Sequence, residues 1–220
     1  MKTKNLFSLA LLCGCLFFAS NSFSQKVVEA NPEFAASIMG RLDGRIYSNQ
    51  VLKFEVKLPD DGVILNQAEA DVYKNAGMDA LKNGDSRNNA RLEAATKKEL
   101  ILINYAKKPI GSPNNSLFIV TALKQNAGVT GSAVIAATLS SLKSTGKFEL
   151  SKSLSRVSIG NTRVDGLEGV LTVNGSIKIK QRVLVFMRNG YSISIGITGM
   201  DDESLNETQG VLSDFKFLAK

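Results

Sequence analysis

The side chains that usually perform catalysis are missing from most of this chain. Its 220 residues include no histidine, and its two cysteines, Cys13 and Cys15, both lie near the amino terminus. Without histidine the chain lacks the Ser-His-Asp and Cys-His arrangements and the common histidine and cysteine zinc sites. The phosphate-binding Walker loop, the GxGxxG dinucleotide motif and the GxSxG motif of hydrolases are also absent. We therefore expect a protein that is not an enzyme and that uses no cofactor or metal.

Two acidic clusters keep carboxylate chemistry open as a third hypothesis. Asp60 and Asp61 belong to a Pro-Asp-Asp-Gly turn, and residues 201–203 (Asp-Asp-Glu) precede an apolar helical pattern. Aspartate favours both positions for local reasons, because it bonds backbone N–H groups in turns and at helix starts. A calcium loop requires more oxygen ligands at alternating positions. We interpret both clusters as structural.

A basic stripe, Lys178, Lys180 and Arg182, occupies alternate positions of a predicted strand. Alternate residues project from the same face of a strand. One interpretation is a docking site for an anion such as a phospholipid head group, an acidic glycan or an acidic protein. The favoured alternative is the solvent-facing end of an amphipathic strand. The formal charge of +7 is spread along the chain rather than clustered with aromatic residues, so nucleic acid is not an expected partner.

The amino terminus predicts export. Lys2 and Lys4 precede the apolar stretch 6–19, which is too short to span a membrane, and small residues then end at Ser24 before Gln25. This pattern predicts a signal peptide over residues 1–24, cleaved between Ser24 and Gln25, and hence a periplasmic or secreted protein.

A lipid anchor is the alternative mode of export. The sequence Leu-Cys-Gly-Cys at 12–15 resembles a bacterial lipobox, in which Cys15 is the lipidated residue. The apolar run continues directly after Cys15, whereas lipoproteins usually become polar there. The protein would therefore contact a membrane only if Cys15 were lipidated.

The stretch 162–198 contains the clearest structural signal. Asn174-Gly175 and Asn189-Gly190 each separate two alternating runs, which predicts three strands joined by two tight turns. Elsewhere the periodicity predicts strands at 51–58, 100–106, 116–123, 148–159 and 215–217, and helices at 66–82, 87–98, 131–143 and from 201 onward. We expect Val72, Ala76 and Ala80, with Met78 and Leu81 nearby, to form the apolar stripe of the first helix, and Ser132 to cap the third.

This order of elements lacks the strand–helix alternation of a parallel sheet. We predict an α+β fold, a twisted and mainly antiparallel sheet flanked by helices on both faces. Residues 45–220 form its single domain, and residues 25–44 a loosely attached segment that precedes it.

Three segments carry a family resemblance: VLKFEVKLPDDG at 51–62, VSIGNTRVDGLEGV at 157–170 and GVLSDFKF at 210–217. Together they resemble the PsbP-like α/β/α sandwich superfamily, which includes exported bacterial members of unknown role. The resemblance implies a binding or assembly module rather than an enzyme, and it assigns no functional residue.

From these observations we expect an exported, non-catalytic binding or accessory protein of the bacterial cell envelope, with an unknown protein or envelope component as partner. The alternative is a carrier of a lipid or another hydrophobic ligand, with a pocket between sheet and helix. In that hypothesis Gly166, Gly169 and Gly196 thin one face of the sheet and make room for the ligand.

Overall fold

The computed structural model describes residues 37–82 and 84–219. The predicted signal peptide, its cleavage point between Ser24 and Gln25, and Cys15 lie outside these residues. Among the residues described, no helix combines the length and the apolar character needed to cross a membrane.

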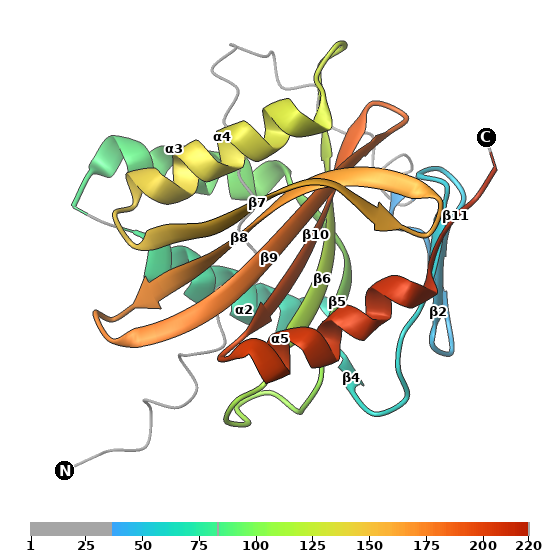
Figure 1. Cartoon of the computed structure of the whole chain (residues 1–220), viewed down its shortest axis with the longest axis horizontal. Coiled ribbons are helices and arrows are strands. Elements are labelled where there is room, and N and C mark those ends of the chain that lie inside the picture. Colours follow the sequence, from blue (N-terminus) through green and yellow to red (C-terminus); the bar gives the residue numbers. More distant parts are fainter. Residues whose placement is uncertain (1–36, 83, 220) are drawn as a thin grey trace.

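A seven-stranded sheet forms the centre of the fold, in the order β4-β5-β6-β10-β9-β8-β7, and Figure 1 shows its twist. Every strand pair recorded in it is antiparallel. The bounds are β4 Val63–Ile64, β5 Leu100–Ala106, β6 Leu117–Lys124, β7 Phe148–Ile159, β8 Thr162–Val173, β9 Ile177–Arg188 and β10 Tyr191–Gly199.

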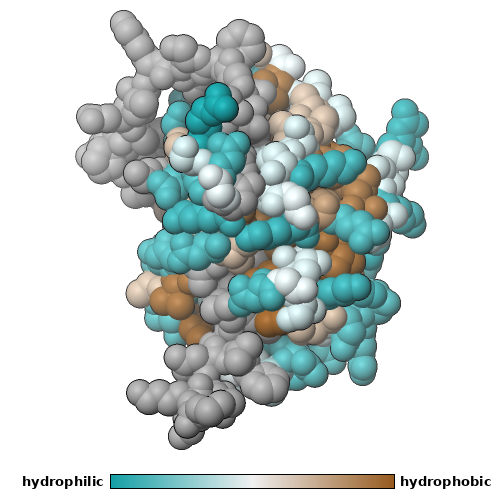
Figure 2. Space-filling view, turned by 90° about the vertical axis from the view of Figure 1, so that its left-hand side faces the viewer, coloured by the Kyte–Doolittle hydropathy of each residue, from teal (hydrophilic) through white to brown (hydrophobic). Residues whose placement is uncertain are grey.

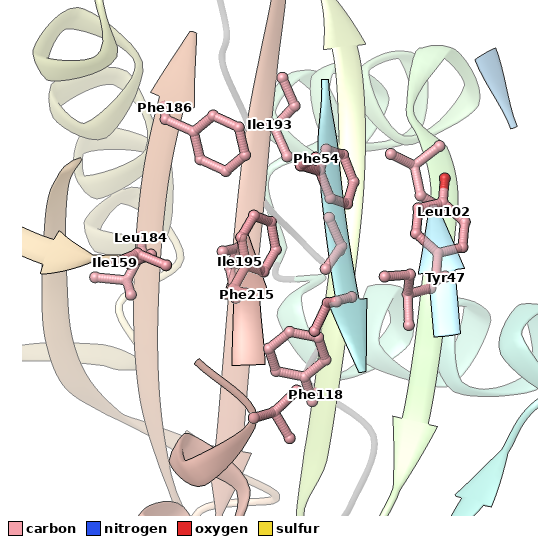
Figure 3. Packing of buried hydrophobic residues seen from close by; sticks show 14 of the residues in the cluster. Tyr47, Phe54, Leu102, Phe118, Ile159, Leu184, Phe186, Ile193, Ile195 and Phe215 are labelled. Atoms are coloured by element: carbon pink, nitrogen blue, oxygen red, sulfur yellow. The ribbon is translucent and has the colours of Figure 1, made fainter. Parts of the chain in front are cut away.

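A second sheet of four antiparallel strands, drawn mostly in blue in Figure 1, packs against one face of the large sheet. Its order is β1-β2-β3-β11, with β1 Arg41–Asp43, β2 Ile46–Asn49, β3 Phe54–Lys57 and β11 Phe215–Phe217. Between the sheets lies an aromatic core in which the rings of Phe54 and Phe215 stack at 5.0 Å and Phe186 meets both edge-on (Figure 3). Helix α5 (Asp202–Gln209) and the 3-10 turn η2 (Gly210–Asp214) contribute Leu205 and Val211 to this core.

Helices α2 (Gln67–Leu81) and α4 (Gly131–Ser144) cover the opposite face of the large sheet, which we call the helix face. Between them in the chain lies α3 (Ser86–Lys98). Asn66 caps α2 in a capping box with Glu69, as the sequence predicts. The carboxyl end of α2 is held by a distant residue, because Lys147 Nζ donates to the carbonyls of Ala80 (2.5 Å) and Lys82 (2.8 Å).

The predicted architecture is confirmed: the fold is α+β, its sheets are antiparallel, and helices lie on both faces of the larger one. Both Asn-Gly turns are present, and each of their asparagines and glycines has a positive φ, as a type I′ turn requires. The predicted strands 100–106 and 148–159 match β5 and β7 within the described bounds.

Three local predictions are wrong. The strand expected at 51–58 is β3 at Phe54–Lys57, because Lys53 has a φ of 57° and the residues before it form a turn. Val72 is 57% exposed, whereas Met78 and Leu81 of the predicted stripe are buried, together with Ala70 and Tyr73. Helix α4 is capped by Thr130, whose hydroxyl accepts from Ala133 N, and not by Ser132.

The segment before residue 45 has firm contacts in its described part. Ile38 is 1% exposed, its carbonyl accepts from Asn49 Nδ2 at 2.7 Å, and Tyr47 donates to the carbonyl of Met39 at 2.8 Å. A Cβ at Gly40 would lie 2.5 Å from the Tyr47 oxygen, so this close approach requires glycine. From Ser37 onward the chain is thus packed into the domain, and residues 25–36 lie outside the description.

Candidate functional site

The basic stripe lies on β9, and two of its three cations are used inside the protein. Lys180 Nζ lies 2.6 Å from Asp202 Oδ2 of α5. Arg182 pairs with Glu168 of β8 at 2.5 Å and also donates to Gln209 at the end of α5. These contacts fasten α5 to the sheet, a structural role that neither interpretation of the stripe included. Lys178 is exposed, so anion docking by the stripe stays a prediction that rests on it alone.

Both acidic clusters also make contacts within the protein, a local one at Asp201 and contacts with residues distant in the sequence at Asp61. Asp201 caps α5 by accepting from Ser204 N at 2.8 Å, and this hydrogen bond lowers the pKa of Asp201. Asp61 accepts from Lys107 at 2.5 Å and from Tyr105 at 3.2 Å, and the bond from Lys107 lowers its pKa. Within residues 37–82 and 84–219 no three acidic residues are grouped to hold a metal. Figure 2 shows hydrophilic side chains over much of one face of the molecule.

A different set of polar groups is buried on the helix face. Glu99, immediately before β5, is 8% exposed, and its carboxylate accepts from Thr121 Oγ1 of β6 at 2.7 Å. Burial raises the pKa of Glu99 to about 8, although the bond from Thr121 and the charge of Lys74 on α2 oppose the shift. Glu99 is therefore mostly protonated at neutral pH, and its carboxyl group can donate as well as accept a hydrogen bond.

Asn104 is the second buried group, and a strand irregularity positions it. The register of β5 shifts between Ile101 and Ile103, so that Leu102 and Ile103 both join the core between the sheets. Asn104 then projects onto the helix face, where it is 3% exposed. Neither its Nδ2 nor its Oδ1 has a hydrogen-bond partner within the described chain.

Thr138 is buried on the same face at the other end of the sheet, where α4 packs on β7, β8 and β9. It is fully buried, and its hydroxyl also lacks a partner among the described residues. A buried hydroxyl or amide without a partner is uncommon in proteins and indicates an unobserved water, ion or ligand. We call Glu99, Asn104 and Thr121, which lie together at β5 and β6, the buried polar layer.

The central strand β10 adds small side chains to the same layer. Its alternation was predicted from sequence, and the structure shows that the small polar side is buried as well as the apolar side. The helix-face residues of β10 are Ser192, Ser194, Gly196 and Thr198. Ser194 lies directly opposite Thr121, and Ser192 accepts from Gln125 Nε2 at 2.8 Å. Hydroxyl groups therefore continue along the layer from β6 to β10.

Two of the three glycines expected to make room for a ligand have no free space beside them. A Cβ at Gly166 would lie 2.4 Å from the Val183 carbonyl oxygen, and one at Gly169 would lie 2.2 Å from the ring of Phe148. These glycines allow close packing of neighbouring strands and side chains, so the explanation that they thin the sheet for a ligand is wrong at both positions. Gly196 remains on the helix face, in the buried strand β10.

The sequence reasoning did not select Glu99, Asn104 or Thr138. A usable signal existed for Asn104, because it is the one polar residue in the run 100–106, which the pattern predicts to be covered on both faces. Glu99 and Thr138 have no comparable signal. Their burial follows from how the helices pack on the sheet.

The fold and the buried layer define an α+β sandwich with unpaired polar groups between its sheet and its helices. No protein-family model matches the chain, and no curated protein sequence matches it either. Among solved structures the chain is similar to cyanobacterial PsbP (CyanoP) from Synechocystis sp. PCC 6803, with 13% identity, a TM-score of 0.49, and coverage of 81% of this chain and 98% of that one.

Two further structures are similar at comparable levels. LpqN, involved in cell envelope biogenesis of Mycobacterium tuberculosis, shares 16% identity over 76% of this chain and 83% of its own, with a TM-score of 0.44. A Bacteroides thetaiotaomicron protein shares 13% identity over 81% of this chain, with a TM-score of 0.43, and the chain spans about half (50%) of that protein's length. The structures similar to this chain thus include a PsbP protein, and these similarities assign no role to the chain.

Proposed function

We propose that this is an exported, non-catalytic binding protein of the bacterial cell envelope, and that it binds a small molecule in the buried polar layer. The observation that carries the proposal is Asn104, a fully enclosed carboxamide with no hydrogen-bond partner in the described chain. An unsatisfied buried polar group costs about 1–3 kcal/mol. A binding protein recovers this free energy when its ligand supplies the missing partners.

The charged side chains of the predicted surface sites are explained by contacts within the protein, which favours a binding site in the interior. Lys180, Arg182 and Asp201 each have a structural partner that explains their presence. Asn104 of the buried polar layer has no such partner within the described residues. The export part of the proposal rests on the predicted signal peptide, which ends at Ser24.

A carrier of a more apolar ligand, such as a lipid, is the second candidate. It is favoured by the apolar side chains beside the buried polar layer, since Ile101, Ile119 and Val183 belong to the core of the helix face. An amphipathic molecule would meet both kinds of group there. Anchoring at Cys15 would make such a carrier a lipoprotein.

Native mass spectrometry of the protein purified from the bacterium that encodes it tests the proposal. We expect the complex to exceed the chain mass by one small molecule, which denaturation releases for identification. Protein unfolded in urea and refolded without cell extract is the matched control and should lack the adduct. A clean unliganded mass in repeated gentle preparations would count against the proposal.

Two further measurements test the export of the protein and its lack of catalytic activity. The intact mass should begin at Gln25 for a free exported protein, or at an acylated Cys15 for a lipoprotein. Broad hydrolase panels should show no turnover, and reproducible activity that disappears on substitution of Asp60 or Asp201 would contradict the non-catalytic assignment.

A further inference from the structure

Asn104 lies in one row across the helix face with residues of the central strands. It lies opposite Ile119 of β6, and Ile119 in turn lies opposite Gly196 of β10. Adjacent strands are about 4.8 Å apart, so Asn104 and Gly196 are separated by about 10 Å across the sheet. Gly196 adds no side chain to this row, and Thr121 and Ser194 supply hydroxyls in the next row along the strands.

The charges around this layer disfavour an ionic ligand. Glu99 is the buried ionisable group of the layer, and its protonated form is neutral at pH 7. Lys74 of α2 is the cation whose charge reaches Glu99, and it is only half-buried. A charged ligand would lose its hydration without gaining a close, fully buried counter-ion from these residues, which is costly. The chemistry of the layer favours a neutral molecule.

A carboxamide presents a donor and an acceptor side by side. Its complement is a planar group that also carries an adjacent donor and acceptor, as lactams, primary amides and pyrimidine bases do. We infer that Asn104 recognises a neutral ligand of this kind through a pair of hydrogen bonds, with the hydroxyl groups of Thr121 and Ser194 beside it. The inference rests on the proposed function, because it names the ligand class of the same site.

The test uses the lactam 2-pyrrolidinone as probe and the mature chain, residues 25–220, labelled with ¹⁵N. Cyclopentanone is the matched control probe, because it keeps the ring and the carbonyl acceptor but lacks the N–H donor. We expect 2-pyrrolidinone to shift the side-chain amide signals of Asn104 saturably, and cyclopentanone to bind about tenfold more weakly. Absence of a saturable shift with the lactam would overturn the inference.

Two variants locate the interaction. Asn104→Leu keeps the approximate volume and removes both hydrogen-bonding atoms, and it should weaken lactam binding by about tenfold or more. Thr138→Val is the matched control, because it removes another unpaired buried group from α4, which packs on β7, β8 and β9 rather than beside Asn104, and it should leave lactam binding unchanged. Circular dichroism checks that both variants fold, and the wild-type titration remains decisive if either does not.

Different results would contradict the proposed binding function and the inference about Asn104. If the molecule that co-purifies from the native host binds Asn104→Leu as tightly as it binds wild type, the inference about Asn104 is wrong and the binding function stands. If no molecule co-purifies and the lactam produces no shift, both proposals are wrong, and water alone satisfies Asn104.

Discussion

Replacing Glu99 with glutamine should remove a large part of the pH dependence of folding stability. Glutamine has nearly the same shape, and its amide oxygen can still accept the hydrogen bond that Thr121 donates at 2.7 Å. The substitution therefore removes the titrating proton and leaves the packing of the helix face intact. What changes is the free energy of unfolding as a function of pH.

The magnitude follows from the pKa of Glu99, which burial raises from its ordinary value of 4.5 to about 8. Between these two values the native state holds a proton that the unfolded chain releases, so the free energy of unfolding falls as the pH rises. For one group the fall is about 2.5 kcal/mol from pH 5 to pH 7 and about 4 kcal/mol from pH 5 to pH 9. The contribution of Glu99 to the pH dependence fades as the pH falls below 4.5, where the unfolded chain also binds the proton.

Urea unfolding followed by circular dichroism at pH 5, 7 and 9 measures this effect as the difference between Glu99→Gln and wild type. Hydrogen bonds lower the pKa values of Asp61 and Asp201, so their stabilisation is already complete above pH 5 and cancels in the difference. Tyr105, whose pKa burial raises to about 12, titrates above the window. Glu149→Gln, at an exposed position on β7, is the matched control and should leave the pH slope unchanged.

The reasoning would be refuted if the wild type and Glu99→Gln unfolded with parallel pH profiles. That outcome would mean that the native carboxyl group titrates as it does in the unfolded chain. Glu99 would then have access to water or to a counter-ion, and the helix face would be less enclosed than the structure describes.

Three further substitutions test contacts on which the layers depend. Gly169→Ala should lower the free energy of unfolding by about 2 kcal/mol in urea titrations, because the added methyl would meet the Phe148 ring at 2.2 Å; an unchanged stability would show that the ring moves aside freely. Lys147→Met should lower the free energy of unfolding by about 1–2 kcal/mol, because the lysine caps carbonyl groups at the carboxyl end of α2. Backbone amides at that end of the helix should then exchange with solvent faster than in the wild type, and unchanged exchange rates there would contradict this role. Arg182→Met should cost about 3 kcal/mol by leaving Glu168 unpaired, and the double variant with Glu168→Met should recover part of that loss. A loss in the double variant equal to the sum of the two single losses would exclude a coupled pair.

The parts of the fold that were predictable depend on short-range chemistry. Asn174 and Asn189 adopt φ values of 51° and 49°, which asparagine tolerates, and the glycine after each completes the turn. Those two turns fix the register of β8, β9 and β10, which form a large part of the sheet. Asp201 likewise caps α5 through atoms only three residues away. Such interactions are present in the local sequence and require no knowledge of the rest of the chain.

The errors come from interactions between residues distant in sequence. Val72 fits an apolar helical stripe, yet α2 rotates so that Tyr73 and Met78 face the sheet and Val72 faces solvent. Lys147 caps a helix 65 residues earlier in the chain, which no local pattern encodes. The register shift that turns Asn104 toward the helices depends on how β5 pairs with β6. The candidate site was missed for this reason, because pairing and helix packing together enclose its residues.

The two faces of the large sheet also differ in a way that bears on function. The face toward the small sheet closes with stacked rings such as Phe54 and Phe215, and its polar residue Asn49 bonds Ile38, Tyr47 and Leu52. The same chain therefore satisfies a buried asparagine completely on that face. On the helix face Asn104 has no bond within the described residues, although leucine at this position would avoid the cost of an unpaired amide. This difference between the two faces is the physical reason for proposing ligand recognition on the helix face.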